Sequence, residues 1–251
     1  MKLLACVLAG MSLAAFPGCG GTGQDEEPLT VGAASSLRSA LADYRGAGDS
    51  AIPEVRISFA GSGLIASQII QGAGIDVFAA ASTTDPEALY EEGLVSKPVA
   101  YASNRMVIGV PVDSQIDSID DLGDPGVSVV IGDDSVPVGA YAREIVGGLP
   151  ADLAAAITGN VRSEEPDAAS ITAKLTQGAA DAGFIYATDA RTAPAGVEVV
   201  RVPADLQPSI VYSAAVVNAS EQPEVAAGYI DGLLSGDGAR RLEAAGFLPA
   251  P

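Results

Sequence analysis

The 251-residue sequence contains no histidine and no tryptophan. Without histidine, the Ser-His-Asp and Cys-His nucleophile systems cannot form, and most zinc and non-haem iron sites are excluded. The two cysteines, Cys6 and Cys19, both lie near the N-terminus, so the rest of the chain has no disulfide or thiolate site. We therefore expect a protein that is not an enzyme.

Basic residues are also scarce. Lys and Arg number 13 against 32 Asp and Glu, which gives a formal net charge of −19. Such an acidic surface repels nucleic acid and anionic lipid, and an anionic ligand would have to be held by local hydrogen-bond donors. Aromatic residues make up 5% of a chain that is 48% hydrophobic, so the core must be mostly aliphatic. The length is sufficient for one large domain or two lobes.

The N-terminal segment "MKLLACVLAGMSLAAFPGCGG" has one lysine and an apolar run of signal-peptide length. We predict a signal peptide over residues 1–18. The letters "FPGC" resemble a bacterial lipobox, in which the cysteine becomes the lipidated first residue, so Cys19 is the expected lipidation site. Residues 19–28 would then form a flexible polar tether that anchors the protein to the outer face of the cell membrane. The alternative is an ordinary cleaved signal with an incidental cysteine.

The body of the chain alternates between strand-like and helix-like segments. "LTVGAA" precedes the helical pattern "SLRSALADY" (36–44), "VRISFAG" precedes "SGLIASQIIQG", and "IDVFAAA" precedes "DPEALYEEGL". The alternation continues to the C-terminus. It predicts an α/β fold with a mostly parallel sheet and helices on both faces.

Several junctions between a strand and a helix carry small or hydroxyl residues. Ser36 (beside Ser35) and Ser62 follow the first two strands, Val138 follows Pro137 at a later helix start, and Ala168 follows Asp167 at another. The strand "GFIY" ends at Tyr186. A helix N-terminus has unpaired N–H groups and a partial positive charge, so it can bind an anion without Lys or Arg. Taken singly, each serine is more typical of a helix cap, Asp167 of a cap, and Tyr186 of a half-buried core residue.

Together these segments resemble the molybdate-binding proteins of bacterial ABC importers, from Leu29 to the C-terminus. The resemblance rests on "TVGAASSLRSAL", "SFAGSGLIASQIIQGAGIDVFAAAS", "NRMVIGVP", "IGDDSVPVGAYAREI", "AADAGFIYATDA" and a final "GF". It implies a two-lobed periplasmic-binding-protein fold (type II), with lobe 1 over 29–109 plus 211–251 and lobe 2 over 110–210. The chain would cross between the lobes in "NRMVIGVP" and "VPADLQPSIVY", and the lobes would close over the ligand.

The resemblance also implies the ligand and its contacts. Molybdate, or tungstate, would be held as an oxyanion by the hydroxyls of Ser36, Ser62 and Tyr186 and by the backbone N–H groups of Val138 and Ala168, with no direct metal ligand and no cofactor. Ser35 stands where the family usually has alanine, so its part in the site stays open. The partners implied are the ABC permease and, through the lipid, the membrane; we expect a monomer that binds no nucleic acid.

Three alternatives remain. The first is a binder of another ligand on the same fold, such as sulfate, phosphate or an iron chelate. The second is an enzyme on a similar two-lobed fold, as in porphobilinogen-polymerising enzymes, which need a body cysteine and a basic cleft that this chain lacks. The third is an adhesion or sensor lipoprotein without a transport role.

Overall fold

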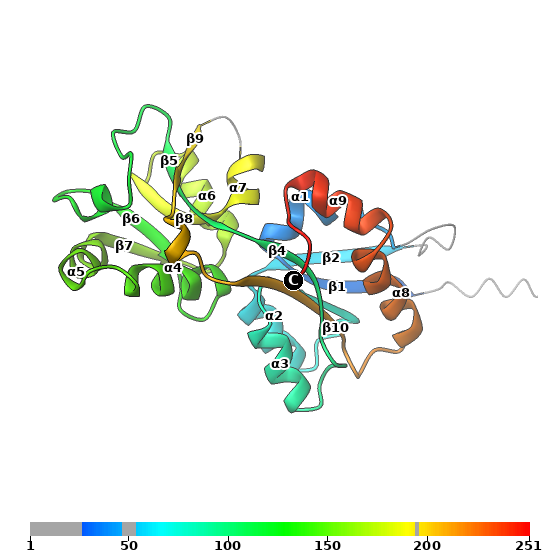
Figure 1. Ribbon diagram of the computed structural model, residues 1–251. Coiled ribbons are helices and arrows are strands. Elements are labelled where there is room, and N and C mark those ends of the chain that lie inside the picture. Colours follow the sequence, from blue (N-terminus) through cyan, green and yellow to red (C-terminus); the bar gives the residue numbers. More distant parts are fainter. Residues whose placement is uncertain (1–26, 47–53, 194–195) are drawn as a thin grey trace, which may run out of the picture.

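The computed structural model describes residues 27–46, 54–193 and 196–251. The predicted signal peptide, Cys6, Cys19 and most of the tether lie outside these residues. The chain forms two lobes side by side (Figure 1), and each contains a five-stranded sheet, in the orders β2-β1-β3-β10-β4 and β7-β6-β8-β5-β9. Among the described helices, none is long and apolar enough to cross a membrane.

The first lobe has helices on both faces of its sheet. Its strands are β2 (Val55–Ala60), β1 (Leu29–Ala34), β3 (Val77–Ala80), β10 (Ile210–Val216) and β4 (Val99–Asn104). Its helices are the 3-10 turn η1 (Ser35–Leu37), α1 (Arg38–Leu41), α2 (Ser62–Ile70), α3 (Thr84–Glu91), α8 (Pro223–Leu234) and α9 (Asp237–Ala245). Successive residues of β3 point to opposite faces: Val77 and Ala79 pack with α1, α8 and α9, while Phe78 and Ala80 pack with α2 and α3. A strand buried on both faces reads as the continuous apolar run seen in the sequence.

The second lobe repeats this plan. Its strands are β7 (Val161–Glu165), β6 (Val129–Gly132), β8 (Ala182–Tyr186), β5 (Met106–Pro111) and β9 (Val197–Arg201). Its helices are η2 (Asp120–Gly123), α4 (Pro137–Gly147), α5 (Ala151–Asn160), α6 (Ala168–Thr176) and α7 (Ala187–Thr192), and η3 (Ala204–Leu206) follows β9.

The prediction of a two-lobed α/β fold is confirmed, but the sheets are mixed rather than mostly parallel. In the first sheet β1 pairs in parallel with β2 and β3, whereas β10 is antiparallel to β3 and β4. In the second, β6 is parallel to β7 and β8, whereas β5 is antiparallel to β8 and β9. β5 and β10 are the strands by which the chain enters one lobe from the other, and each runs opposite to its neighbours.

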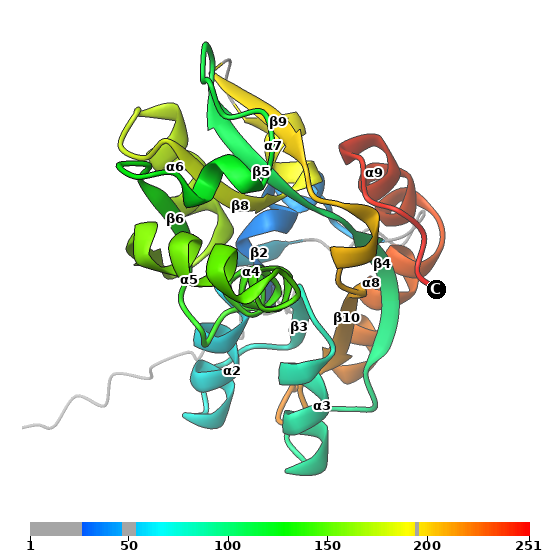
Figure 2. The ribbon, with the colours of Figure 1, turned by 60° about the vertical axis from the view of Figure 1, so that its left-hand side comes forward.

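The crossings lie close to the two predicted segments. Figure 2 shows the ribbon of β4 continuing into β5 across the lobes, and the chain returns between β9 and β10. The change of sheet occurs at Arg105, because Asn104 ends β4 and Met106 begins β5. The boundary predicted between residues 109 and 110 therefore falls inside β5, while the return near residues 210 and 211 falls at the start of β10.

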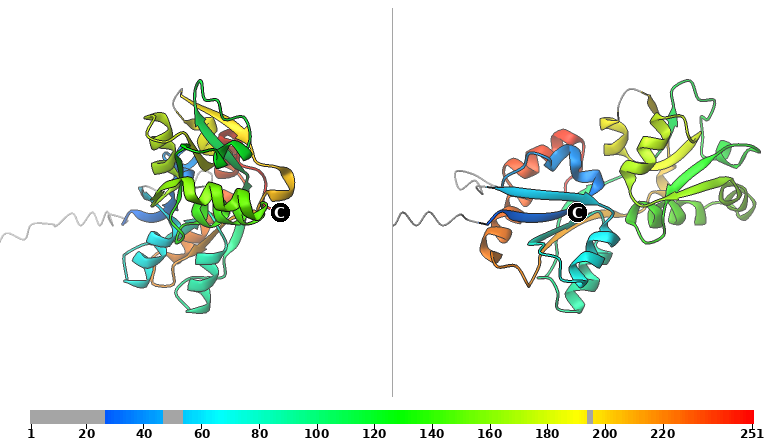
Figure 3. Two further views of the ribbon diagram at one scale, coloured as in Figure 1. Left: turned by 90° about the vertical axis from the view of Figure 1, so that its left-hand side faces the viewer. Right: turned by 180° about the vertical axis from the view of Figure 1, so that it is seen from behind.

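This topology brings several helix starts to the face between the lobes (Figure 3). In the first lobe β1 runs into η1 and β2 into α2; in the second, β6 leads to α4 and β7 to α6. The carboxyl ends of parallel strands meet at one edge of a sheet, which is where ligands bind in open α/β sheets.

Candidate functional site

The five residues expected to bind the ligand all line one cavity between the lobes. Ser36 and Ser62 come from the first lobe, and Val138, Ala168 and Tyr186 from the second. The cavity encloses about 210 Å³, including the part open to solvent. The remaining lining residues are Ala34, Ser35, Ala60, Gly61, Ala81, Val136, Pro137 and Asp167. Segments far apart in the sequence thus contribute to a single small space.

Ser62 is the first residue of α2 and is 1% exposed. Its Oγ accepts a hydrogen bond of 3.1 Å from the backbone N–H of Ala81. A hydroxyl has one proton to donate, and because the oxygen already accepts here, that proton stays available to the cavity. Ser62 is therefore placed as a donor.

The glycines beside Ser62 allow the two lobes to come close. A Cβ on Gly61 would clash with the carbonyl oxygen of Pro166 and lie 2.8 Å from Val136, and a Cβ on Gly63 would clash with the carbonyl of Ser135. These obstacles all belong to the second lobe. The start of α2 consequently packs against the opposite lobe with no room for side chains.

Ser36 lies in η1 and is 3% exposed. Its Oγ is 2.9 Å from the hydroxyl of Tyr212, a residue of β10 that is not among those lining the cavity. Ser35 is also buried and lines the same cavity, and its side chain makes no hydrogen bond within the described residues. Both serines of this junction therefore lie at the site, and the hydroxyl of Ser36 is hydrogen-bonded to that of Tyr212.

Two helix N-termini of the second lobe face the cavity. Pro137 begins α4, so the N–H of Val138 lies among the first amides of that helix, which lack helical partners. Ala168 begins α6. Asp167 caps this helix, since its Oδ1 accepts a 2.8 Å hydrogen bond from the N–H of Ser170. The carboxylate that lines the cavity is thus also engaged by its own helix.

Tyr186 ends β8 and is 1% exposed. Its hydroxyl is buried and has no hydrogen-bond partner among the described residues. Burial raises the pKa of Tyr186 well above its usual value, so the side chain stays neutral and keeps its proton. A buried hydroxyl without a partner costs free energy unless a ligand satisfies it.

No lysine or arginine is among the residues lining the cavity in the described part of the chain, and Asp167 is the one charged residue there. An adjacent hollow shares Ser35 and Ser36 with the cavity and adds Arg38 and Asp189. Burial, together with the nearby Asp167, raises the pKa of Asp189 from its usual 3.8 to about 7, although a backbone hydrogen bond at Tyr186 opposes the rise. The cavity itself offers neutral donors.

The sequence reasoning missed three residues around the site: Tyr212 and Asn104 behind Ser36, and Asp189 beside it. Tyr212 belongs to a strand of apolar and small residues, and Asn104 to the end of another strand. Neither stands at a strand-to-helix junction, so the pattern that singled out the serines carried no signal for them.

Comparisons with known proteins show the family of the chain. The profile of the family described as bacterial extracellular solute-binding protein matches residues 29–248. A molybdate-binding protein ModA from Mycobacterium bovis is 33% identical over 256 aligned positions, which cover 96% of this chain and 95% of the relative.

Two solved structures share the fold. The periplasmic molybdate-binding protein of Azotobacter vinelandii superposes with a TM-score of 0.75 at 22% identity, covering 89% of this chain and 100% of the other. The sulfate-binding protein SubI of Mycobacterium tuberculosis superposes with a TM-score of 0.78 at 18% identity, covering 88% and 86%. These relatives are binding proteins and not enzymes. The chain belongs to the bacterial extracellular solute-binding proteins, in the family that includes the mycobacterial proteins named ModA.

Proposed function

We propose that this protein captures molybdate, and also tungstate, in the cavity between its lobes and delivers it to the permease of an ABC importer. The observation that carries the proposal is the convergence of uncharged donors from both lobes on one small space. The mycobacterial relative that is 33% identical over almost the whole chain is named for molybdate binding. Ser36, Ser62 and Tyr186 would donate through hydroxyls, and Val138 and Ala168 through backbone amides.

The number of donors follows from the energetics. Removing an anion from water into a low-dielectric interior costs tens of kcal/mol, and a hydrogen bond to a charged group returns about 1.5–3 kcal/mol net. Several converging donors are therefore needed, and the positive ends of α4 and α6 add to them. The loss of one donor should weaken binding clearly.

The cavity also limits the size of the ligand. The total space of the cavity, including the part open to solvent, is about 210 Å³, and only about 10 Å³ of this admits the centre of a water-sized sphere. A compact inorganic oxyanion suits that space better than a nucleotide or a sugar. Sulfate is the main competitor, because its charge and tetrahedral shape match the same donors. Hydrogen phosphate fits less well, because its proton would need an acceptor and Asp167, the one carboxylate of the lining, already accepts from the N–H of Ser170.

Titration calorimetry with molybdate, tungstate, sulfate and hydrogen phosphate tests the proposal. We expect molybdate and tungstate to bind, sulfate to bind more weakly, and phosphate not to bind measurably. A protein that binds sulfate more tightly than molybdate would be a sulfate binder on this fold and would contradict the assignment. A protein that binds none of the four would contradict oxyanion capture itself.

The substitution Ser62→Ala tests the site. We expect molybdate affinity to fall at least tenfold, which corresponds to about 1.4 kcal/mol, while the fold is kept. Ser67→Ala is the matched control, because Ser67 lies on the same helix but is exposed and bonds to the carbonyl of Gly63. Equal affinity in the Ser62→Ala variant and the wild type would remove Ser62 from the site.

The importer role extends the proposal to the membrane. A lipid on Cys19 would hold the monomeric protein at the outer face of the cell membrane, with residues 19–28 as a tether to the permease. Detergent phase partitioning of the wild type and of Cys19→Ala tests the anchor: the wild type should enter the detergent phase and the variant should not. Molybdate uptake by cells lacking this chain should fall, and unchanged uptake would contradict a transport role.

A further inference from the structure

Tyr212 lies directly behind Ser36 as seen from the cavity. It is 0% exposed, and its hydroxyl is 2.9 Å from Ser36 Oγ. Two hydroxyls at this distance share one hydrogen bond, and either could donate. The direction of this bond decides what Ser36 presents to a ligand: its proton if the oxygen accepts from Tyr212, or only lone pairs if it donates to Tyr212.

The side chain of Asn104 favours donation from Tyr212 to Ser36. Its Oδ1 lies 2.9 Å from the backbone N–H of Arg105, which can only donate, so this end of the amide is the oxygen. Its Nδ2 therefore faces the other way, 2.9 Å from Thr188 Oγ1 and 3.4 Å from the Tyr212 hydroxyl. An amide nitrogen donates and does not accept, so the Tyr212 oxygen is the acceptor in this long contact. The proton of Tyr212 is then free to point at Ser36.

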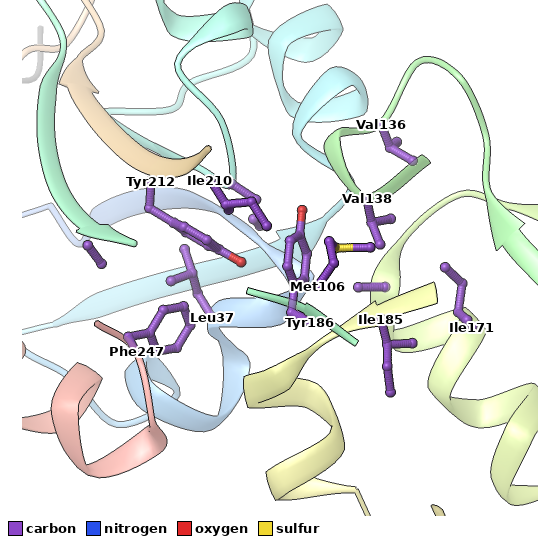
Figure 4. Packing of buried hydrophobic residues seen from close by; sticks show 14 of the residues in the cluster. Leu37, Met106, Val136, Val138, Ile171, Ile185, Tyr186, Ile210, Tyr212 and Phe247 are labelled. Carbon is purple, nitrogen blue, oxygen red and sulfur yellow. The ribbon is translucent and has the colours of Figure 1, made fainter. Parts of the chain in front are cut away.

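The surroundings of Tyr212 hold its ring and keep it protonated. Tyr101, Tyr186 and Phe247 contact it edge-on, with ring centroids 6.3, 5.8 and 5.1 Å away. Figure 4 shows the hydroxyl end of Tyr212 directed toward the ring of Tyr186, with Phe247 below Tyr212. Burial, and to a smaller degree the nearby Asp189, raises the pKa of Tyr212 far above its usual value. The side chain consequently remains a donor.

We propose that Tyr212 is a positioning residue that holds Ser36 as a hydrogen-bond donor toward the bound anion, so that the site selects fully deprotonated oxyanions over protonated ones. The donor direction runs from Asn104 to Tyr212, from Tyr212 to Ser36, and from Ser36 into the cavity. Buried chains of this kind strengthen each member. The backbone N–H of Ala81 likewise donates to Ser62 Oγ. Each serine oxygen then accepts a hydrogen bond from the protein and keeps its own proton for the ligand. This inference rests on the proposed oxyanion function.

The test measures the affinities for molybdate and hydrogen phosphate by calorimetry in four proteins: wild type, Tyr212→Phe, Ser36→Ala and the double variant. We expect Tyr212→Phe to weaken molybdate binding about tenfold in the wild-type background and less than about twofold in the Ser36→Ala background, because the tyrosine acts through the serine. The preference for molybdate over hydrogen phosphate should also narrow in Tyr212→Phe, since the freed oxygen of Ser36 can then accept a proton. A purely structural role would leave that preference unchanged.

Tyr101→Phe is the matched control. Tyr101 is 6% exposed, contacts the Tyr212 ring, and has a buried hydroxyl without a partner among the described residues, but it does not line the cavity. Its variant should keep the wild-type affinity within about twofold. Thermal unfolding of the ligand-free proteins checks that each variant folds. If Tyr212→Phe does not fold, Asn104→Leu takes its place in the same cycle, with the same expected dependence on Ser36.

Two results would overturn the inference while leaving the proposed function intact: equal losses from Tyr212→Phe with and without Ser36, or no loss at all. A wild-type protein that binds no molybdate, tungstate or sulfate would instead overturn the proposed function, and the inference with it. The wild-type titration thus separates the two failures.

Discussion

The side-chain amide of Gln207 bonds to both backbone groups of Met106. Its Oε1 accepts from the Met106 N–H at 3.1 Å, and its Nε2 donates to the Met106 carbonyl at 2.8 Å. Met106 begins β5 just after the first crossing, and Gln207 lies in the returning segment between β9 and β10. One side chain therefore ties together the two segments that join the lobes.

Gln207→Ala should lower the free energy of unfolding by about 1–3 kcal/mol, because it leaves two backbone groups of a fully buried residue without this partner. Urea unfolding measures the loss. Gln177→Ala, at an exposed position of the second lobe, should change stability by less than about 0.5 kcal/mol. Equal stabilities of the two variants would show that the contact does not hold the crossing together.

Tyr186→Phe should separate ligand binding from stability. The hydroxyl has no partner among the described residues, so its removal should leave the stability of the ligand-free protein within about 0.5 kcal/mol of the wild type. Molybdate affinity should fall about tenfold or more, because a donor to a charged group is lost. Tyr229→Phe, which also removes a buried unpartnered hydroxyl, should alter neither affinity nor stability strongly. An unchanged affinity in Tyr186→Phe would exclude this tyrosine as a ligand contact.

Gly61→Ala should hinder closure of the lobes. The backbone at Gly61 has φ −63° and ψ 141°, which alanine adopts readily, so the obstacle is the opposite lobe at Pro166 and Val136. We expect at least a tenfold loss of molybdate affinity and a larger radius of gyration by small-angle X-ray scattering with ligand present. Gly74→Ala, where a Cβ would meet nothing within 4 Å, is the control. If the Gly61→Ala variant kept the wild-type radius of gyration and the wild-type affinity for molybdate, close packing of the two lobes at Gly61 would not be needed for binding.

Asp189 should make stability depend on pH. Its pKa in the folded protein, about 7, lies above its usual 3.8, so the folded state binds more protons than the unfolded state between these values. Stability from this group is therefore highest near pH 4 and falls as the pH rises through about 7. Asp189→Asn should be more stable than the wild type at pH 8, by about 1 kcal/mol or more, and should differ little at pH 4.

Urea unfolding of Asp189→Asn and the wild type from pH 4 to pH 8 measures this dependence. Asp43→Asn removes an equal charge from an exposed position and should leave the pH profile of the wild type unchanged. Parallel profiles for Asp189→Asn and the wild type would show that Asp189 ionises normally in the folded protein.

Prediction from the sequence was most successful where a local pattern of residues is compatible with a single kind of structure. The alternation of apolar strand-like segments with helical segments predicted the α/β class. A repeat of about two residues places apolar side chains on one face of a strand, whereas a repeat of about 3.6 residues places them on one face of a helix. The Ser62 and Ala168 helix starts were found because a small or hydroxyl residue after a strand marks the end of the sheet where parallel α/β folds bind ligands. Prediction was less successful at Ser36: the helix expected over 36–44 is a 3-10 turn followed by a short helix ending at Leu41. The antiparallel course of β5 and β10 was also missed, because strand direction is set by partners distant in sequence.

The sequence by itself determined which chemical groups were available: hydroxyls and helix-start amides, few cations, and no histidine at all. Only the tertiary structure decided that these groups face one cavity and what stands behind them. Ser36 and Tyr212 are 176 residues apart along the chain, yet their hydroxyls lie 2.9 Å apart. The hydroxyl of Tyr212 also accepts a long hydrogen bond from a third residue, Asn104, on another strand. Such contacts arise when strands from distant parts of the chain enter one sheet, and no local pattern of residues encodes them.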